Sequence, residues 1–152
     1  TGQNLGAKRY DRIRSGIRTA ALMAVATALV ITACMLLFGR PLLSLFLSGE
    51  QSVQDQVLAV AYRYLAIMSV MLFVLYLLHV YRSALQGMGD TIVPMLSGFI
   101  EMLMRIGSAV FLPAYVGQDG VFLAEVIAWT GAAVLLIVMF YIRTRGWRGR
   151  TG

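Results

Sequence analysis

The stretch TAALMAVATALVITACMLLF, Thr19–Phe38, contains twenty residues and no charged side chain. The hydrocarbon core of a bilayer is about 30 Å thick, and an α-helix of roughly 20 apolar residues spans it. This stretch therefore predicts a membrane-spanning helix. The composition of the whole chain agrees, because 59% of its 152 residues are hydrophobic, 13% are charged and the mean hydropathy is +0.77. Ordinary soluble domains carry about 25% charged residues.

Three further apolar segments follow, over residues 57–81, 92–116 and 121–142. The second segment begins in more polar helical turns, and the other two contain only a few charged side chains. None of the segments alternates between lipid-facing and lumen-facing residues, as the strands of a membrane barrel do. The sequence therefore predicts an all-α polytopic membrane protein with four transmembrane helices, spanning about 19–38, 57–81, 92–116 and 121–142.

The basic residues are distributed unevenly around these four segments. Ten of the thirteen Lys and Arg residues precede the first segment, follow the second or follow the fourth: Lys8, Arg9, Arg12, Arg14, Arg18, Arg82, Arg143, Arg145, Arg148 and Arg150. Positively charged loops stay on the cytoplasmic side of a membrane. We therefore expect a multi-pass protein of the cell membrane, with both ends of this chain in the cytoplasm. The basic residues flank spans and are not interleaved with exposed aromatics, so they indicate contact with anionic lipid and no nucleic-acid partner.

The stretch SALQGMGDTIVP, Ser83–Pro94, separates the second and third segments. Gly87 and Gly89 allow backbone conformations that other residues avoid. Asp90 can cap the start of the next helix, and Pro94 is tolerated near the first turn of that helix. The stretch predicts a tight cytoplasmic hairpin, which is either a plain turn or part of a gate.

Ionisable residues inside a bilayer are the first place to look for function. Glu101 and Arg105 lie four residues apart in the third segment and so share one helix face, which predicts an ion pair. Two interpretations remain open: a site for a proton, a sodium ion or a cationic substrate, and a static pair that fixes packing. Glu125 is either part of an outward-facing cation path or an interfacial acid, and His79 is either a proton relay or an interfacial hydrogen-bonding residue.

Aromatic and Met side chains of the second segment, Met68 and Tyr76 among them, either line a site for flat organic cations or simply pack. The sequence contains one His and one Cys, Cys34, and no metal-ligand spacing, P-loop or nucleophile elbow. We therefore expect neither an enzyme nor a cofactor or metal site.

Several motifs together resemble one transporter family. GQNLGA (2–7) precedes a basic segment, LQGMGDTIVP (85–94) joins two spans, and Gly120 and Trp129 precede an Arg-rich tail with Trp147. Their order and spacing resemble the C-terminal half of the multidrug and toxic compound extrusion transporters. The resemblance implies a twelve-helix, two-lobed protein in which residues 1–152 are the C-terminal part of the second lobe. The N-terminal lobe and the first helices of the C-lobe would then be missing here, as the start at Thr1 also suggests.

The resemblance implies a cation-coupled antiporter, driven by H⁺ or Na⁺, that exports small organic cations by alternating access with the missing N-terminal half as partner. Some members carry a cation-coordinating acid on the helix that corresponds to residues 64–81, and this sequence has none there, so the coupling ion stays undecided. Two alternatives remain: a lipid or polysaccharide flippase of the same superfamily, and a non-transporting structural membrane module. The module would pack tightly through small-residue faces at Gly98 and Gly107, or at Gly131 and Ala132.

Overall fold

The computed structural model describes residues 1–48, 51–117 and 119–149. All regular elements within these residues are helices, which confirms the all-α prediction. In chain order they are α1 (Gly2–Gly6), α2 (Tyr10–Ser44), α3 (Gln51–Val70), α4 (Leu72–Gly87), α5 (Ile92–Phe111), α6 (Pro113–Val116), α7 (Asp119–Thr144) and the short 3₁₀ helix η1 (Arg145–Gly149).

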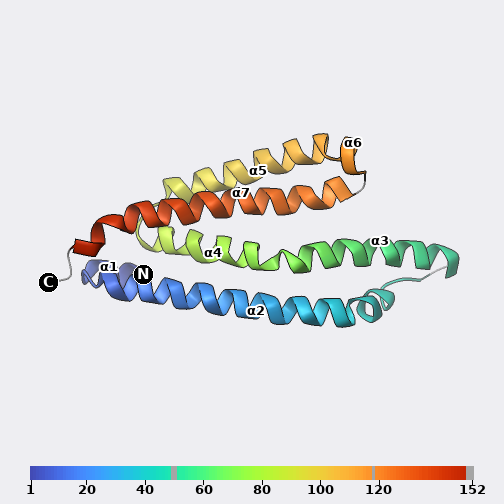
Figure 1. The fold of residues 1–152 in the computed structure, drawn as a ribbon, viewed down its shortest axis with the longest axis horizontal. Coiled ribbons are helices and arrows are strands. Elements are labelled where there is room, and N and C mark those ends of the chain that lie inside the picture. Colours follow the sequence, from blue (N-terminus) through green and yellow to red (C-terminus); the bar gives the residue numbers. More distant parts are fainter. Residues whose placement is uncertain (49–50, 118, 150–152) are drawn as a thin grey trace.

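The long helices lie side by side along one common axis (Figure 1). α2 forms one side of the bundle, α3 and α4 follow one another through the middle, and α5 and α7 form the other side. The first and last described elements, α1 and η1, lie at one end of the bundle, together with the α4–α5 hairpin, whereas α6 lies at the opposite end.

Three helical stretches among the described residues are long and apolar enough to cross a membrane: Tyr10–Ser44, Ile92–Val116 and Asp119–Trp147. α3 and α4 pass the same test together, as a pair bent by 45°. The outward faces of α2 and α5 carry large exposed apolar side chains, such as Leu37, Phe99 and Leu103. Such surfaces are stable in lipid and costly in water.

The break between α3 and α4 lies at Met71, where the sequence has neither Pro nor Gly. The amide of Val74 donates to the carbonyl of Met71 at 3.0 Å, a tighter turn than the α-helical one. The hydroxyl of Thr32, on α2, donates to the carbonyl of buried Ser69. Because a bilayer supplies no water to a carbonyl at a helix break, a side chain of the neighbouring helix satisfies it.

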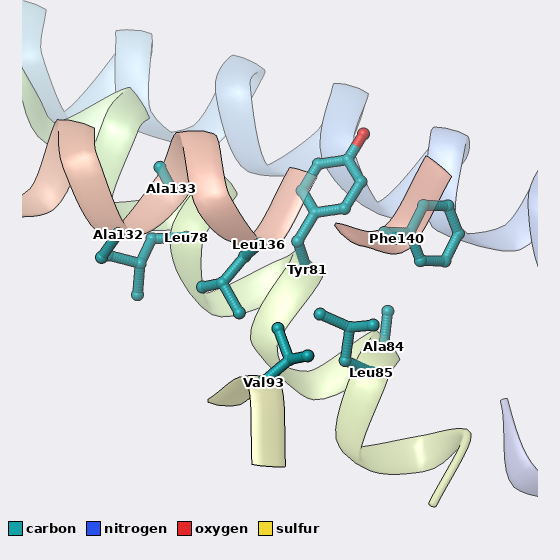
Figure 2. Packing of buried hydrophobic residues seen from close by; sticks show 9 residues of the cluster. All are labelled: Leu78, Tyr81, Ala84, Leu85, Val93, Ala132, Ala133, Leu136 and Phe140. Atoms are coloured by element: carbon teal, nitrogen blue, oxygen red, sulfur yellow. The ribbon is translucent and has the colours of Figure 1, made fainter. Parts of the chain in front are cut away.

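The best-buried apolar cluster lies toward the end of the bundle that holds the chain termini. α4 and α7 form most of it, and α5 adds one side chain (Figure 2): Leu78, Tyr81, Ala84, Leu85, Val93, Ala132, Ala133, Leu136 and Phe140. The small alanines of α7 let α4 approach closely, as is common between membrane helices. The rings of Tyr81 and Phe140 meet edge to face at a centroid distance of 5.3 Å.

Gly120 is buried where α7 begins against the α5–α6 junction, and this contact generates a stability prediction. A Cβ atom at Gly120 would lie 2.5 Å from the nitrogen of Pro113 and 2.6 Å from the carbonyl carbon of Leu112. Both are backbone atoms, so Gly120→Ala should lower the free energy of unfolding by about 1–3 kcal/mol. Thermal unfolding in detergent micelles measures this change.

Gly98 provides the matched control. It is exposed on α5, and a Cβ atom there would meet nothing within 4 Å. Gly98→Ala should therefore leave stability unchanged or raise it by about 0.5–1 kcal/mol through helix propensity. If the two variants unfold at the same temperature, the close crossing of α6 and α7 is wrong.

Candidate functional site

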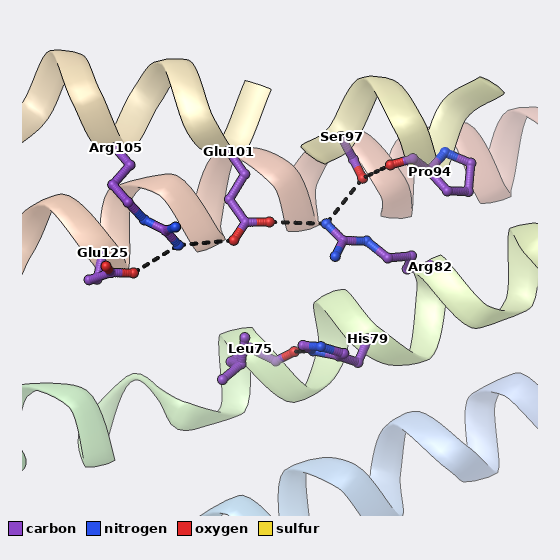
Figure 3. Close-up of polar contacts among 8 residues, drawn as sticks. All are labelled: Leu75, His79, Arg82, Pro94, Ser97, Glu101, Arg105 and Glu125. Atoms are coloured by element: carbon purple, nitrogen blue, oxygen red, sulfur yellow. Dashed lines mark hydrogen bonds and ion pairs between the residues drawn. The ribbon is translucent and has the colours of Figure 1, made fainter. Parts of the chain in front are cut away.

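Four charged side chains from three helices form a continuous ion-pair network (Figure 3). Arg82 comes from α4, Glu101 and Arg105 come from α5, and Glu125 comes from α7. Positive and negative groups alternate along the network, and its formal charge sums to zero. A charge at the bilayer centre costs on the order of 2.5–3.5 kcal/mol by insertion scales, so pairing is what makes four such groups tolerable.

Glu101 is the central member of the ion-pair network. Its Oε2 accepts from Nη2 of Arg82 at 3.0 Å, and its Oε1 accepts from Nη2 of Arg105 at 3.1 Å. Nη2 of Arg82 also donates to the hydroxyl of Ser97 at 3.2 Å, and this hydroxyl donates to the carbonyl of Pro94 at 2.7 Å. Both oxygens of Glu101 are therefore occupied by guanidinium groups.

Glu125 lies at the other end of the ion-pair network and is held less tightly. Its Oε2 lies 2.9 Å from Nη2 of Arg105, and its side chain is 31% exposed, against 18% for Glu101. Arg105 is thus shared between two carboxylates on different helices. The Nε atoms of Arg82 and Arg105 are buried without a hydrogen-bond partner, so neither guanidinium uses all its donors.

The pair Glu101–Arg105, predicted from their spacing, is confirmed. Arg82 was missed as a member of the network, and Glu125 was named as a candidate without its partner Arg105. Arg82 was assigned to the basic flank of a span, although it and Glu101 both lie roughly two to three helical turns from the hairpin at Asp90. An antiparallel hairpin with its turn at Asp90 places Arg82 of α4 beside Glu101 of α5, so the pair could have been predicted from the hairpin. Glu125 lies near the start of α7, as expected, but its partner Arg105 depends on how α5 packs against α7.

The other candidate residues lie apart from the ion-pair network. His79 is exposed on α4, and its Nδ1 lies 2.9 Å from the carbonyl of Leu75, one turn earlier. A carbonyl oxygen only accepts, so this contact places a proton on Nδ1. Met68 on α3 and Tyr76 on α4 are half-buried and take no part in the network. No polar contact among the described residues makes His79 part of a relay.

The α4–α5 hairpin is built as the sequence predicts at three positions. Gly89 has a φ of +83°, a conformation that L side chains rarely adopt. Oδ1 of Asp90 accepts the amide of Val93 at 3.1 Å, which caps the start of α5, and Pro94 is the third residue of that helix. Oδ2 of Asp90 also accepts Nε of Arg143 at 3.1 Å, which ties the hairpin to the end of α7.

The expectation for Gly87 was wrong. Its φ is not positive, so it supplies no unusual backbone conformation. A Cβ atom at Gly87 would instead lie 2.9 Å from Cβ of Thr1, and one at Gly2 would lie 3.0 Å from the carbonyl oxygen of Gly87. Gly87 is therefore needed for the close approach of α1 to the hairpin.

The opposite end of the bundle carries its own polar contact between α3 and α7. Arg63 forms an ion pair with Asp119, and the rings of Tyr64 and Phe122 lie beside it at a centroid distance of 5.0 Å. α7 is thus tied to its neighbours by an ion pair at each end, Arg63–Asp119 at one and Asp90–Arg143 at the other.

A helical bundle of apolar spans with a neutral ion-pair network inside it fits a membrane transporter, and comparison with known proteins identifies which kind. The family model of MatE matches residues 1–111. The chain belongs to the MatE family. The family predicted from the motifs is confirmed, and MatE proteins are polytopic membrane transporters. No curated protein and no solved structure matches it. Its place in the C-terminal half stays a prediction.

The geometry of the ion-pair network predicts unequal costs for removing its two carboxylates. Glu101→Gln leaves both Arg82 and Arg105 without a charged partner on α5, and should lower the free energy of unfolding by about 3 kcal/mol. Glu125→Gln leaves Arg105 paired with Glu101 and should cost about 1 kcal/mol. Thermal unfolding of both variants in lipid nanodiscs measures the difference. Equal losses, or a larger loss for Glu125→Gln, would contradict the central position of Glu101.

Proposed function

We propose that this MatE chain is part of an antiporter that uses an inward H⁺ or Na⁺ gradient to export small organic cations by alternating access. The observation that supports it is the ion-pair network of Arg82, Glu101, Arg105 and Glu125 among apolar helices. Ionisable groups inside a membrane protein mark ion and substrate pathways. A broken helix, here α3–α4, is a second feature typical of secondary transporters.

Glu125 is the carboxylate better suited to receive a cation. It is the more exposed of the two acids and has a single ion-pair partner among the described residues. Glu101 lies between two guanidinium groups, which favour its ionised form but repel an incoming cation. The role of cation acceptor therefore falls to Glu125, and Glu101 anchors Arg82 and Arg105.

Coupling follows from the shared position of Arg105. When a proton or a sodium ion neutralises Glu125, Arg105 loses its partner on α7 and keeps Glu101, which lies on its own helix α5. The charged contact between α5 and α7 is then gone. A cation gradient would in this way bias the packing of α7 against α5, which is the differential contact that a coupled conformational change requires.

The ion pairs at the two ends of α7 fit the same mechanism. Alternating access needs one side of the protein to open while the other stays closed. Arg63–Asp119 lies at one end and Asp90–Arg143 at the other, and this structure has both formed. Breaking one pair at a time would free one end of α7 without releasing the other.

One observation favours a second function, a flippase for a lipid-linked substrate. A groove of about 550 Å³ between α2, α4 and α7 is lined by Arg14 and Arg18 and by no carboxylate. An anionic headgroup fits such a lining better than an organic cation does. The structural-module hypothesis predicted tight packing at one of two small-residue faces. A Cβ atom at Gly98 or Gly107 would meet nothing within 4 Å, whereas one at Gly131 would clash with the side chain of Met104, and Ala132 is buried. Close packing at Gly131 and Ala132 is compatible with a transporter as well, so it does not favour the module.

The transport experiment uses the full-length protein that contains this chain, reconstituted in sealed vesicles loaded with a fluorescent organic cation. An imposed H⁺ gradient and an imposed Na⁺ gradient are tested separately, which identifies the coupling ion. We expect gradient-driven efflux from the wild type and at least a tenfold slower rate for Glu125→Gln, with the folded yield unchanged. Asp55→Asn, at an exposed position on α3, is the matched control and should transport normally.

Two outcomes would count against the proposal. If Glu125→Gln retains wild-type efflux under both gradients, Glu125 does not receive the coupling cation. If no gradient drives efflux of any organic cation from the wild type, the antiporter proposal fails, and transfer of a fluorescent anionic lipid between leaflets becomes the activity to measure.

A further inference from the structure

The groove between α2, α4 and α7 lies toward the end of the bundle that holds the chain termini. Side chains of all three helices line it. Its volume is about 550 Å³, and α2 supplies most of its lining: Arg14, Ser15, Ile17, Arg18, Ala21, Leu22 and Val25, with Leu77 and Tyr81 from α4 and Phe140 and Tyr141 from α7. A second hollow of about 390 Å³ adjoins it, shares Arg14 and Tyr141, and adds Arg145.

The lining changes character along the groove. Arg14 and Arg18 lie toward the start of α2, and the lining residues of α2 after Arg18, which are Ala21, Leu22 and Val25, are apolar. Val25 lies eleven positions after Arg14, which is about 16 Å along a helix. The groove is therefore basic at the end near the chain termini and apolar toward the membrane interior.

The arginines of this groove have no carboxylate partner. Arg63, Arg82, Arg105 and Arg143 each pair with a carboxylate, whereas in the described part of the chain Arg14, Arg18 and Arg145 form no ion pair. Arg9 and Arg12 form none either, but they do not line the groove, so what sets Arg14 and Arg18 apart is the apolar lining beside them. A soluble anion would use the arginines but not the apolar half, and a neutral lipid would use the apolar half but not the arginines.

We propose that this groove binds an anionic phospholipid of the leaflet on the side of the chain termini. The phosphate is held by Arg14 and Arg18, and an acyl chain lies along Ala21, Leu22 and Val25 against α4. This lipid fills the space between α2 and the core and so holds α2 in place.

The first test uses the full-length protein purified in detergent, with phosphatidylglycerol or phosphatidylcholine added and bound lipid counted by native mass spectrometry. The wild type should retain phosphatidylglycerol in preference to phosphatidylcholine. The double variant Arg14→Gln with Arg18→Gln should bind phosphatidylglycerol about 30-fold more weakly, the effect of two lost charges near an anionic group. Arg9→Gln with Arg12→Gln removes the same charge from exposed positions outside the groove and should bind as the wild type does.

The second test fills the apolar half of the groove. Ala21 lines it, so Ala21→Trp should displace phosphatidylglycerol, whereas Ala26→Trp, on an exposed face of α2 outside the groove, should not. Equal weakening by the two Arg double variants would overturn the proposal, because diffuse attraction would then explain the binding. The proposal is also overturned if the wild type shows no preference for phosphatidylglycerol. If Ala21→Trp lowers the unfolding temperature but leaves the amount of bound phosphatidylglycerol unchanged, the proposal is overturned as well, because another part of the protein then occupies the groove.

Discussion

The arrangement of α4, α5 and α7 depends on one constraint: a charge inside a bilayer must be paired. The ion-pair network satisfies this constraint, because each carboxylate contacts at least one guanidinium and the total charge is zero. Its members are Arg82, Glu101, Arg105 and Glu125. Only Glu101 and Arg105 can satisfy one another within a single helix. Arg82 and Glu125 need partners from other helices, so the demand for pairing draws α4 and α7 toward α5, and small residues on α7 make the close approach sterically possible.

The same rule of satisfied polar groups explains features away from the ion-pair network. The Ser69 carbonyl at the α3–α4 break accepts a hydrogen bond from the hydroxyl of Thr32 on α2. The carboxylate of Asp90 accepts one hydrogen bond from the amide of Val93 in the first turn of α5 and another from the side chain of Arg143. The guanidinium groups that line the groove beside α2 have no carboxylate partner among the described residues. The charge of that lining is the reason for assigning the groove to an anionic lipid.

The sequence predicts those parts of the structure that depend on local chemistry. The apolar runs predict helices, Gly89 and Asp90 predict the turn and the cap, and the spacing of Glu101 and Arg105 predicts their pairing. Features that depend on packing between helices were missed. The break at Met71 was not predicted, because the sequence has no Pro or Gly there. The ion-pair partners of Arg82 and Glu125 were not predicted, because they come from other helices. The role of Gly87 was misread because its neighbour, Thr1, is 86 positions away in the sequence.

The most direct test of the pairing constraint compares a partial removal of charge with a complete one. Arg105→Gln leaves Glu125 without its guanidinium partner, whereas a quadruple variant with Gln at positions 82, 101, 105 and 125 leaves no charge at all. If pairing governs the site, the quadruple variant in lipid nanodiscs unfolds at a higher temperature than the single variant Arg105→Gln, although it carries three more substitutions. If the quadruple variant is the less stable of the two, the four side chains contribute separately, and the constraint proposed for this transporter is wrong.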